Sequence, residues 1–315
     1  MKKYLHVAVG VIENNFGQIL IAKRPESAHQ GGLWEFPGGK VDSGENCQQA
    51  LFRELNEELA IQVENSEPLI QIRHDYNDKS VLLDVHKVTC FSGEPKGNEG
   101  QPVRWVNPEF LSEYAFPAAN QPIIQAVRLS RFCAITGSFD SLNDFTEKFS
   151  RLVSSKRKMV QLRIKDFSLQ QHNEYIDVAK GMCDKNIQLQ VNTSVNEFLK
   201  IDSNFKLGLH LNSRGLMQLE FRPVDKKILL GASCHSLAEL KRAEKIQADY
   251  VYLSPVKPTY SHPGVEALGW EKFQKIVEQI NIPVYALGGM TETDLTAAIQ
   301  SGAQGIASIS AWWCE

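Results

Sequence analysis

The sequence has few cysteines, no long apolar run and no strong excess of charge of one sign. Its six cysteines are scattered over 315 residues without a C-x-x-C pair or another metal-ligand spacing, which argues against a disulfide framework or a zinc site and predicts free thiols. No apolar run approaches the ~18 residues of a membrane span, and the run 7–12 behind Lys2 and Lys3 is too short for a signal peptide. We therefore expect a cytoplasmic protein without a membrane partner.

The composition is otherwise that of a globular protein, with 43% hydrophobic and 23% charged residues. Up to Val127 the sequence has 11 Lys and Arg against 17 Asp and Glu, and the rest has 23 against 20. Neither part is basic enough to predict a nucleic-acid partner. If the acidic part handles phosphates, it needs metal cations to bring the two anions together.

A change of pattern near residue 130 predicts an α/β domain over 1–130 and a second domain over 131–315. In the first domain the expected strands are 4–12, 18–22, 70–74, 81–91 and 103–106, the first two forming a hairpin. One helix is expected from Asn46, the N-cap of a capping box that Gln49 completes, and another over 121–130. In the second domain, helical segments alternate with expected strands at 132–136, 159–164, 187–191, 206–211, 227–231, 250–253, 284–287 and 305–307. Eight βα units predict a closed (β/α)8 TIM barrel.

The segment 38–61 places three carboxylates on one helix face. Glu54, Glu57 and Glu58 face away from an apolar stripe of leucines. Like charges at this spacing cost a few tenths of a kcal/mol each, roughly, and a hard divalent ion such as Mg²⁺ would reverse that effect. From the glutamates alone, a solvated acidic face is the alternative interpretation.

The wider spacing resembles the Nudix box, the signature of hydrolases that cleave nucleoside diphosphates linked to another group. The resemblance is carried by Gly39, Glu45 and the run 53–61, with Ala60 standing where the family usually has Gly. It implies an α/β/α sandwich and Mg²⁺ or Mn²⁺ as cofactor. It also implies that the Gly38 carbonyl, Glu57 and Glu58 ligate the metal, that Glu54 acts as base or further ligand, and that Arg53 and Glu45 orient the carboxylates.

Further segments resemble the MutT branch of that family, the 8-oxo-dGTP pyrophosphohydrolases that remove oxidised nucleotides from the pool for DNA replication and repair. These segments are 23–24, 28–29, 34–40, 98–102 and 116–122. The resemblance implies contacts of Arg24 with phosphate, Glu99 with metal, and Asn120 and the Phe36 backbone with the base. It also implies substrate contacts by His29, Gly39, Lys40 and Lys79, the last standing where the branch tends to have Arg. The alternatives are a surface charge for Arg24, a loop residue for Glu99 and a helix N-cap for Asn120.

The chemistry of the oxidised base supports the expectation for Asn120. Oxidation of guanine at C8 turns N7 into a donor, while O6 stays an acceptor. One amide group offers an acceptor and a donor side by side, so it matches the oxidised base and mismatches guanine.

The second domain resembles the thiamine-phosphate synthase and TenI group of barrels through 231–236, 248–259, 283–290 and 302–310. The metal-binding Asp positions of the synthases read Asn192-Thr193 and Asn212-Ser213 here, and the catalytic His of the tautomerases falls at Pro255. We therefore expect a barrel without synthase activity. The expected phosphate-binding residues are Arg163, Lys165, Gly288, Gly289 and Ser308, with tight turns as the alternative for the glycines.

Three functions follow as hypotheses. The first is hydrolysis of 8-oxo-dGTP to 8-oxo-dGMP and pyrophosphate, with a small-molecule nucleotide as partner. The second is a thiamine-pathway protein whose Nudix site hydrolyses a pyrimidine or thiamine-related pyrophosphate. The third makes the barrel a non-catalytic sensor of a thiazole or thiamine phosphate.

Overall fold

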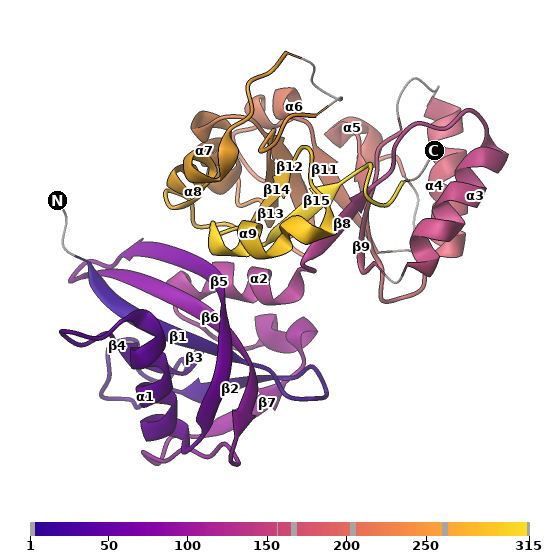
Figure 1. The fold of residues 1–315 in the computed structure, drawn as a ribbon. Coiled ribbons are helices and arrows are strands. Elements are labelled where there is room, and N and C mark those ends of the chain that lie inside the picture. Colours follow the sequence, from indigo (N-terminus) through magenta and orange to yellow (C-terminus); the bar gives the residue numbers. More distant parts are fainter. Residues whose placement is uncertain (1–3, 156, 165–168, 202–205, 260–263, 314–315) are drawn as a thin grey trace. The chain divides into compact units, whose positions relative to one another are not determined.

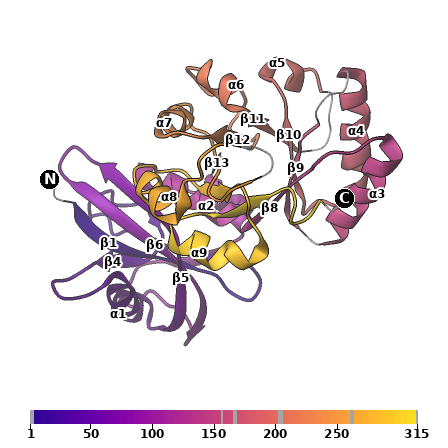
Figure 2. The ribbon, with the colours of Figure 1, turned by 45° about the horizontal axis from the view of Figure 1, so that its top comes forward.

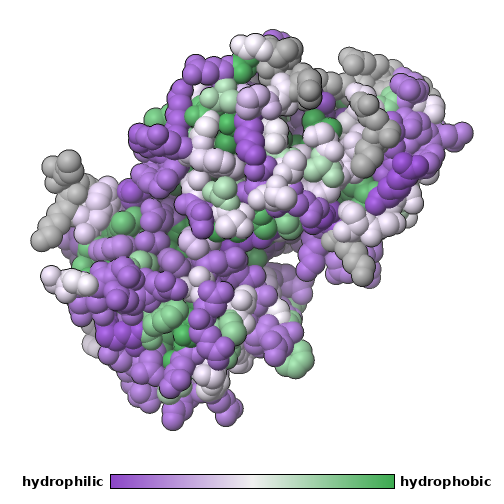
Figure 3. All heavy atoms as spheres, in the orientation of Figure 1, coloured by the Kyte–Doolittle hydropathy of each residue, from purple (hydrophilic) through white to green (hydrophobic). Residues whose placement is uncertain are grey.

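The computed structural model describes residues 4–155, 157–164, 169–201, 206–259 and 264–313. Contacts divide the chain into two compact units, Met1–Arg128 and Leu129–Glu315 (Figure 1). No helix within the described ranges is long and apolar enough to cross a membrane. The visible face carries mainly hydrophilic residues, with apolar ones in small scattered groups (Figure 3).

The first unit has two β-sheets. The larger has the order β4 (Gly38–Lys40), β1 (Leu5–Ile12), β6 (Ser80–Ser92) and β5 (Gln62–Asp75), and its β1–β6 pair is parallel while the other pairs are antiparallel. The smaller sheet has the order β3 (Trp34–Glu35), β2 (Ile19–Lys23) and β7 (Val103–Val106) and is antiparallel.

Two helices cover opposite faces of the larger sheet. Ala8 and Ile12 of β1 pack with the buried leucines of α1 (Cys47–Leu59), whereas Val9 and Val11 pack with α2 (Gln121–Arg128). This alternation follows from the period of two along a strand. The predicted α/β/α sandwich is confirmed. Two 3₁₀ turns, η1 (Pro108–Glu113) and η2 (Ala118–Asn120), precede α2.

One expectation for this unit is wrong, and another covers only part of a strand. The first two strands do not form a hairpin: the turn after Glu13 closes a single bridge, Glu13 to Ile19, and β2 then pairs with β3 and β7 in the other sheet. The strand expected over 70–74 runs from Gln62 to Asp75. Its first half is polar and contains Pro68, and register shifts at Val63/Asn65 and Pro68/Ile70 accommodate those residues.

The second unit is a closed parallel barrel, as predicted (Figure 2). Its strands are β8 (Phe132–Ile135), β9 (Met159–Leu162), β10 (Gln188–Asn192), β11 (Leu207–Leu211), β12 (Leu230–Cys234), β13 (Tyr250–Leu253), β14 (Val284–Leu287) and β15 (Gly305–Ser308). The described helical segments between and after them are α3 (Leu142–Ser154), α4 (Leu169–Met182), α5 (Val195–Phe198), α6 (Ser213–Met217), α7 (Leu237–Lys245), α8 (Gly269–Val277), η3 (Glu292–Asp294) and α9 (Leu295–Gln300).

Large side chains fill one part of the barrel core. Tyr250, Tyr252 and Tyr285 are fully buried there. The Tyr250 ring lies so close to Gly231 that a Cβ atom at Gly231 would come within 2.1 Å of it. The packing of this ring therefore requires glycine at position 231. Gly231 lies in β12, which begins three residues later than the expected strand 227–231, because a turn at Asp225–Ile228 precedes it.

Candidate active site

Helix α1 presents the acidic residues, and its own sequence sets its ends. Asn46 and Gln49 form the predicted capping box at its start, and Leu51, Leu55 and Leu59 are completely buried. The helix ends at Ala60, whose φ of 57° and ψ of 34° lie in the left-handed region. The face opposite the leucines therefore turns Glu54, Glu57 and Glu58 away from the core.

Arg53 gathers the carboxylates of this helix. Its guanidinium donates to both Glu45 oxygens at 2.8 and 2.9 Å, to Glu54 at 2.8 Å, to Glu57 at 3.2 Å and to the Lys40 carbonyl at 3.1 Å. The bond to Arg53 lowers the pKa of Glu45 to about 2. Glu45 therefore stays ionised and fixes the guanidinium, which in turn orients Glu54 and Glu57.

Glu58 lies at the centre of an acidic cluster. Its carboxylate accepts a hydrogen bond of 3.1 Å from the Gly38 amide. Burial, followed by the charge of Glu35 and smaller contributions from Glu54 and Glu99, raises the pKa of Glu58 to about 8. The structure thus brings together four of the expected metal ligands, Gly38, Glu54, Glu58 and Glu99, and it adds Glu35.

Glu99 reaches this cluster on a loop that caps α1. The Asn98 side chain and amide donate to the Glu57 and Glu58 carbonyls, both at 2.9 Å, and Gln101 Nε2 donates to the Glu58 carbonyl at 3.0 Å. Gln101 Oε1 accepts from the Glu99 amide at 2.9 Å. One glutamine therefore joins the end of the helix to the position of Glu99.

Gly39 and Lys40 follow the amide that binds Glu58. A Cβ atom at Gly39 would lie 2.0 Å from the carboxyl carbon of Glu54, so only glycine permits this approach. The Lys40 side chain is exposed.

Arg24, expected to contact phosphate, and His29 and Lys79, expected to contact substrate, form a second group. Arg24 pairs with Glu35, and its Nε donates to the His29 carbonyl at 2.8 Å. His29 Nδ1 lies 3.4 Å from Asp78 in the turn that also holds Lys79, while His29 Nε2 is buried without a hydrogen-bond partner among the described residues. A buried orphan nitrogen of this kind calls for a ligand or a water.

The two residues expected to contact the base, Phe36 and Asn120, are both buried. Phe36 is buried and stacks on Phe116, with ring centroids 5.3 Å apart. Asn120 is 8% exposed, and its side chain makes no hydrogen bond to any described residue. The N-cap interpretation of Asn120 is therefore wrong, because the residue ends the turn η2 and runs directly into α2 without a side-chain bond to the helix.

Sequence reasoning missed Glu35 and Tyr76. Glu35 connects the two groups, since it pairs with Arg24 and its charge acts on Glu58. Burial raises its own pKa, against the effect of Arg24. The signal that could have identified Glu35 in the sequence is its place as a charged residue between Trp34 and Phe36, in an otherwise apolar stretch. Tyr76 hydrogen-bonds the Ala119 backbone, and its ring packs edge-on against the His29 ring with centroids 4.9 Å apart. No motif or residue spacing in the sequence indicated a role for Tyr76.

The barrel holds a cavity of about 810 Å³. Four of the expected phosphate-binding residues line it: Arg163, Gly288, Gly289 and Ser308. Lys165 lies outside the described residues. The φ angles of Gly288 and Gly289 are 98° and 65°, and Cβ atoms there would come within 2.9 Å of Pro255 and 2.6 Å of the Pro258 carbonyl. These glycines thus form a tight turn and line the cavity at the same time.

Asn192, Thr193 and Asn212 line this cavity at the positions where the resemblance places metal-binding Asp residues. The one carboxylate among the described lining residues is Glu197, which sequence reasoning missed and which accepts hydrogen bonds from the Thr193 and Ser194 hydroxyls at 2.6 and 2.9 Å. His210, in the fully buried interior, has its pKa lowered to about 3 by burial.

Comparison with known proteins matches each unit to a family. Residues 132–312 match the family model described as thiamine monophosphate synthase, and residues 8–126 match the model of the NUDIX domain. The 8-oxo-dGTP diphosphatase of Escherichia coli (strain K12) is 38% identical over 128 residues, which are 41% of this chain and 98% of that protein. The CTP pyrophosphohydrolase of the same organism is 36% identical over 124 residues, 39% of this chain and 91% of that protein.

For the barrel, the putative thiamine-phosphate synthase 2 of Aquifex aeolicus (strain VF5) is 32% identical over 185 residues, 58% of this chain and 98% of that protein. Fold, acidic helix and relatives together define a hydrolase domain joined to a parallel barrel. The chain belongs to the Nudix family through its first unit and to the thiamine monophosphate synthase family through its second.

Proposed function

We propose that the first unit is a nucleoside triphosphate pyrophosphohydrolase that converts 8-oxo-dGTP to 8-oxo-dGMP and pyrophosphate, with Mg²⁺ or Mn²⁺ as cofactor. The observation that carries the proposal is the acidic cluster around Glu58, whose pKa is raised to about 8. A relative named 8-oxo-dGTP diphosphatase supports the substrate.

The donor set fits a hard divalent ion. Glu57, Glu58, Glu99 and the Gly38 carbonyl, with Glu54 as a further candidate, would supply oxygen ligands, the kind that Mg²⁺ and Mn²⁺ prefer. Burial, followed by repulsion from Glu35, Glu54 and Glu99, raises the pKa of Glu58, and the positive charge of a bound cation would offset both effects. When bound, the ion neutralises the triphosphate and the leaving pyrophosphate.

The protein's own groups orient the reactants. Arg53 holds Glu54 and Glu57 in fixed positions. Glu54, which lies close to Gly39, would ligate the ion or accept the proton of the attacking water. Arg24 is a phosphate-binding candidate that shares its charge with Glu35. The pairing limits how far Arg24 can move.

Selection of the base rests on Asn120. Its amide is nearly buried and unused by any described residue, so it is available to pair with O6 and N7–H of the oxidised base. Guanine would place acceptor against acceptor and leave buried groups unpaired, a mismatch that can reduce kcat/KM by up to ~10⁴-fold.

Steady-state kinetics of the full chain with Mg²⁺ on 8-oxo-dGTP, dGTP, CTP and a pyrimidine pyrophosphate test this proposal. We expect the highest kcat/KM for 8-oxo-dGTP, its selective loss in Asn120→Ala, and no change in Asn107→Ala, a matched change at an exposed asparagine. Glu57→Gln should remove most activity on every substrate. An equal loss for 8-oxo-dGTP and dGTP in Asn120→Ala contradicts the role of Asn120. A preference for CTP or for the pyrimidine pyrophosphate contradicts the oxidised purine.

A second function is favoured by the barrel cavity, and it does not depend on the first. We propose that the barrel binds a thiazole or thiamine phosphate without synthase activity. Arg163 and the Gly288–Gly289 turn line the cavity, whereas Asn192 and Asn212 provide neutral amides in place of metal-binding carboxylates. Should a pyrimidine pyrophosphate be the best Nudix substrate, both units would act in one thiamine-related reaction sequence.

A further inference from the structure

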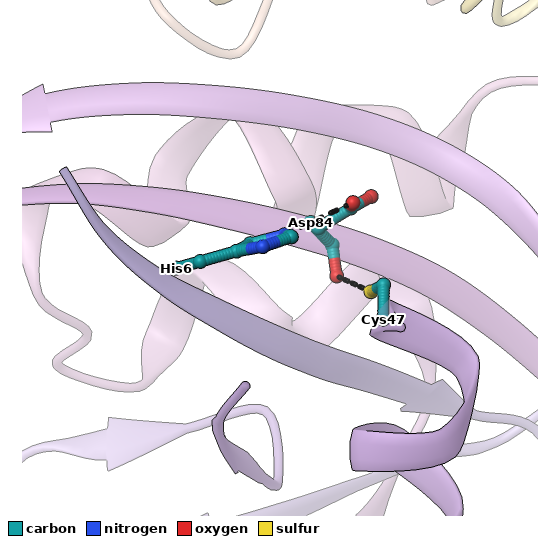
Figure 4. Close-up of side chains that lie close together, drawn as sticks. All are labelled: His6, Cys47 and Asp84. Carbon is teal, nitrogen blue, oxygen red and sulfur yellow. Dashed lines mark hydrogen bonds and ion pairs between the residues drawn. The ribbon is translucent and has the colours of Figure 1, made fainter. Parts of the chain in front are cut away.

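A cluster of metal-binding side chains lies on the α1 face of the larger sheet, at the start of the helix. His6 comes from β1, Asp84 from β6 and Cys47 is the first residue of α1. The His6 ring faces the Asp84 carboxylate, and the Cys47 sulfur faces the main-chain carbonyl of Asp84, to which it donates at 3.8 Å (Figure 4). Their ligand atoms all lie within 4.8 Å of one another. His86, two residues along β6, lies beside them.

Three separations between neighbouring side chains are close to those of ligands that share one ion. His6 Nε2 lies 3.2 Å from Asp84 Oδ2, and His86 Nε2 lies 3.6 Å from Asp84 Oδ1 and 3.7 Å from Cys47 Sγ. Bonds of roughly 2.0–2.3 Å to Zn²⁺ place neighbouring ligands of a tetrahedron about 3.3–3.8 Å apart. The ligand atoms of His6, Cys47 and Asp84 would therefore need only small movements to surround one ion, and His86 adjoins the last two of them.

Surrounding residues orient the ligands. Asp84 also accepts a hydrogen bond from Gln71 on β5, and His86 Nδ1 faces the Ser66 hydroxyl at 3.4 Å, which leaves Nε2 directed at the cluster. A hydrogen bond on the far nitrogen of a histidine is the usual support of a metal ligand. Asp84, His86 and Cys47 are partly buried and His6 is the more exposed, with 37% of its side chain accessible, so an ion could enter past His6.

The charges of the cluster are compatible with a cation. Burial and the neighbouring Asp84 raise the pKa of Cys47 to about 12. Both causes disfavour a bare thiolate, and the positive charge of a bound divalent ion would offset them. Asp84 is held ionised despite its burial, because hydrogen bonds from His86 and His6 lower its pKa.

We propose that His6, Cys47, Asp84 and His86 form a second metal site that binds one Zn²⁺ ion. The sulfur and imidazole donors suit Zn²⁺, whereas the carboxylates of the opposite half of α1 suit Mg²⁺. The ion would tie the first turn of α1 to β1 and β6. The spacing of cysteines in the sequence argued against zinc, but the ligands here are brought together by strand pairing across 78 residues.

Metal titration of the chelator-treated full chain tests the proposal. Excess Mg²⁺ is present throughout to occupy the carboxylate site. We expect one equivalent of Zn²⁺ to be retained after dialysis. Co²⁺ in its place should give a thiolate charge-transfer band and the intense visible bands of tetrahedral coordination. Cys47→Ser should abolish the charge-transfer band, and His6→Gln should weaken Zn²⁺ binding by at least ~10-fold. Cys90→Ser, at an exposed thiol, is the matched control and should bind as the parent does.

The inference is overturned if the parent shows no thiolate band with Co²⁺, or if the band persists in Cys47→Ser. It is also overturned if Glu57→Gln, rather than Cys47→Ser, removes the bound Zn²⁺. In each of these cases the four side chains form only a hydrogen-bonded network. Because no readout is the hydrolase activity, failure here leaves the proposed function untouched.

Discussion

At the scale of single residues, Ala60 holds a conformation that suits glycine better. Its φ of 57° places Cβ near the following carbonyl, at a cost of roughly 1 kcal/mol for a non-glycine residue. We expect Ala60→Gly to raise the free energy of unfolding by about 0.5–1 kcal/mol, since part of the gain is offset by the greater freedom of glycine in the unfolded chain.

Denaturant titration of the two proteins measures this difference. Ala50→Gly, at a fully buried position in the first turn of α1, is the opposite control and should destabilise. A loss of stability in Ala60→Gly would show that the Cβ of Ala60 contributes packing that outweighs the backbone term. Activity should be unchanged, because Ala60 supplies no ligand.

Glu58 gives the metal-free protein a defined pH dependence. Its pKa is 4.5 in the unfolded reference and about 8 in the folded chain, so between these values the folded state holds a proton that the unfolded state has lost. The stabilisation is complete below pH 4.5 and disappears as the pH rises through about 8. We expect a decline of roughly 2–4 kcal/mol over this window.

Chemical denaturation in a chelator at several pH values measures the decline. Glu58→Gln, which stays neutral, should flatten it, and Mg²⁺ should stabilise the parent more at pH 8 than at pH 5 because the ion displaces the proton. A parent curve as flat as that of Glu58→Gln would contradict the raised pKa.

At the scale of elements, the loop 96–101 performs two tasks at the end of α1. It satisfies the last carbonyl groups of the helix, and through Gln101 it fixes the backbone of Glu99. We expect Gln101→Ala to cost about 1 kcal/mol of stability and also to raise the Mg²⁺ concentration needed for half-maximal activity several-fold.

Asn98→Ala is the matched control, because it removes a cap of the same helix but leaves the contact between Gln101 and Glu99 in place. It should lose similar stability and keep its Mg²⁺ dependence. If both variants change the Mg²⁺ dependence equally, the loop acts on the site only through helix stability.

The elements also show how far sequence reasoning reaches. Helix α1 was predicted with its capping box and its buried stripe, because those signals are local. The extent of β5 was not, since its polar first half is a strand only through pairing with β6 across bulges. For the same reason the cluster at His6, Cys47 and Asp84 could not be read from the sequence: its members meet through strand register and helix packing.

Site residues, too, could be predicted where the signal is local, and not where their role depends on contacts distant in the sequence. Helical spacing predicted that the three glutamates of α1 share one face, and the resemblance added Arg53, which in the structure hydrogen-bonds Glu54 and Glu57. Glu35 was missed because its role depends on two contacts distant in sequence, with Arg24 and Glu58. The cap role considered for Asn120 was wrong because a 3₁₀ turn leads into α2 and leaves no separate N-cap position.

At the scale of the whole molecule, two families with different chemistry share one chain. Whether the barrel catalyses synthesis or only binds a ligand is a question that its cavity allows us to test. Condensing a pyrimidine pyrophosphate with a thiazole phosphate requires a metal ion to stabilise the departing pyrophosphate. The cavity offers Asn192 and Asn212 where carboxylates would hold that ion, and Glu197 is hydrogen-bonded to Thr193 and Ser194.

We therefore expect the full chain with Mg²⁺ to form no thiamine phosphate from these two substrates, yet to bind thiamine monophosphate in isothermal titration calorimetry. Arg163→Gln should weaken that binding by ~10-fold, the loss of about one charge-assisted hydrogen bond. Arg151→Gln, on the exposed face of α3, should not. If thiamine phosphate does form, and Glu197→Gln abolishes it, then Glu197 provides the missing carboxylate and the barrel is a synthase. If thiamine monophosphate does not bind, the cavity serves a ligand of another class.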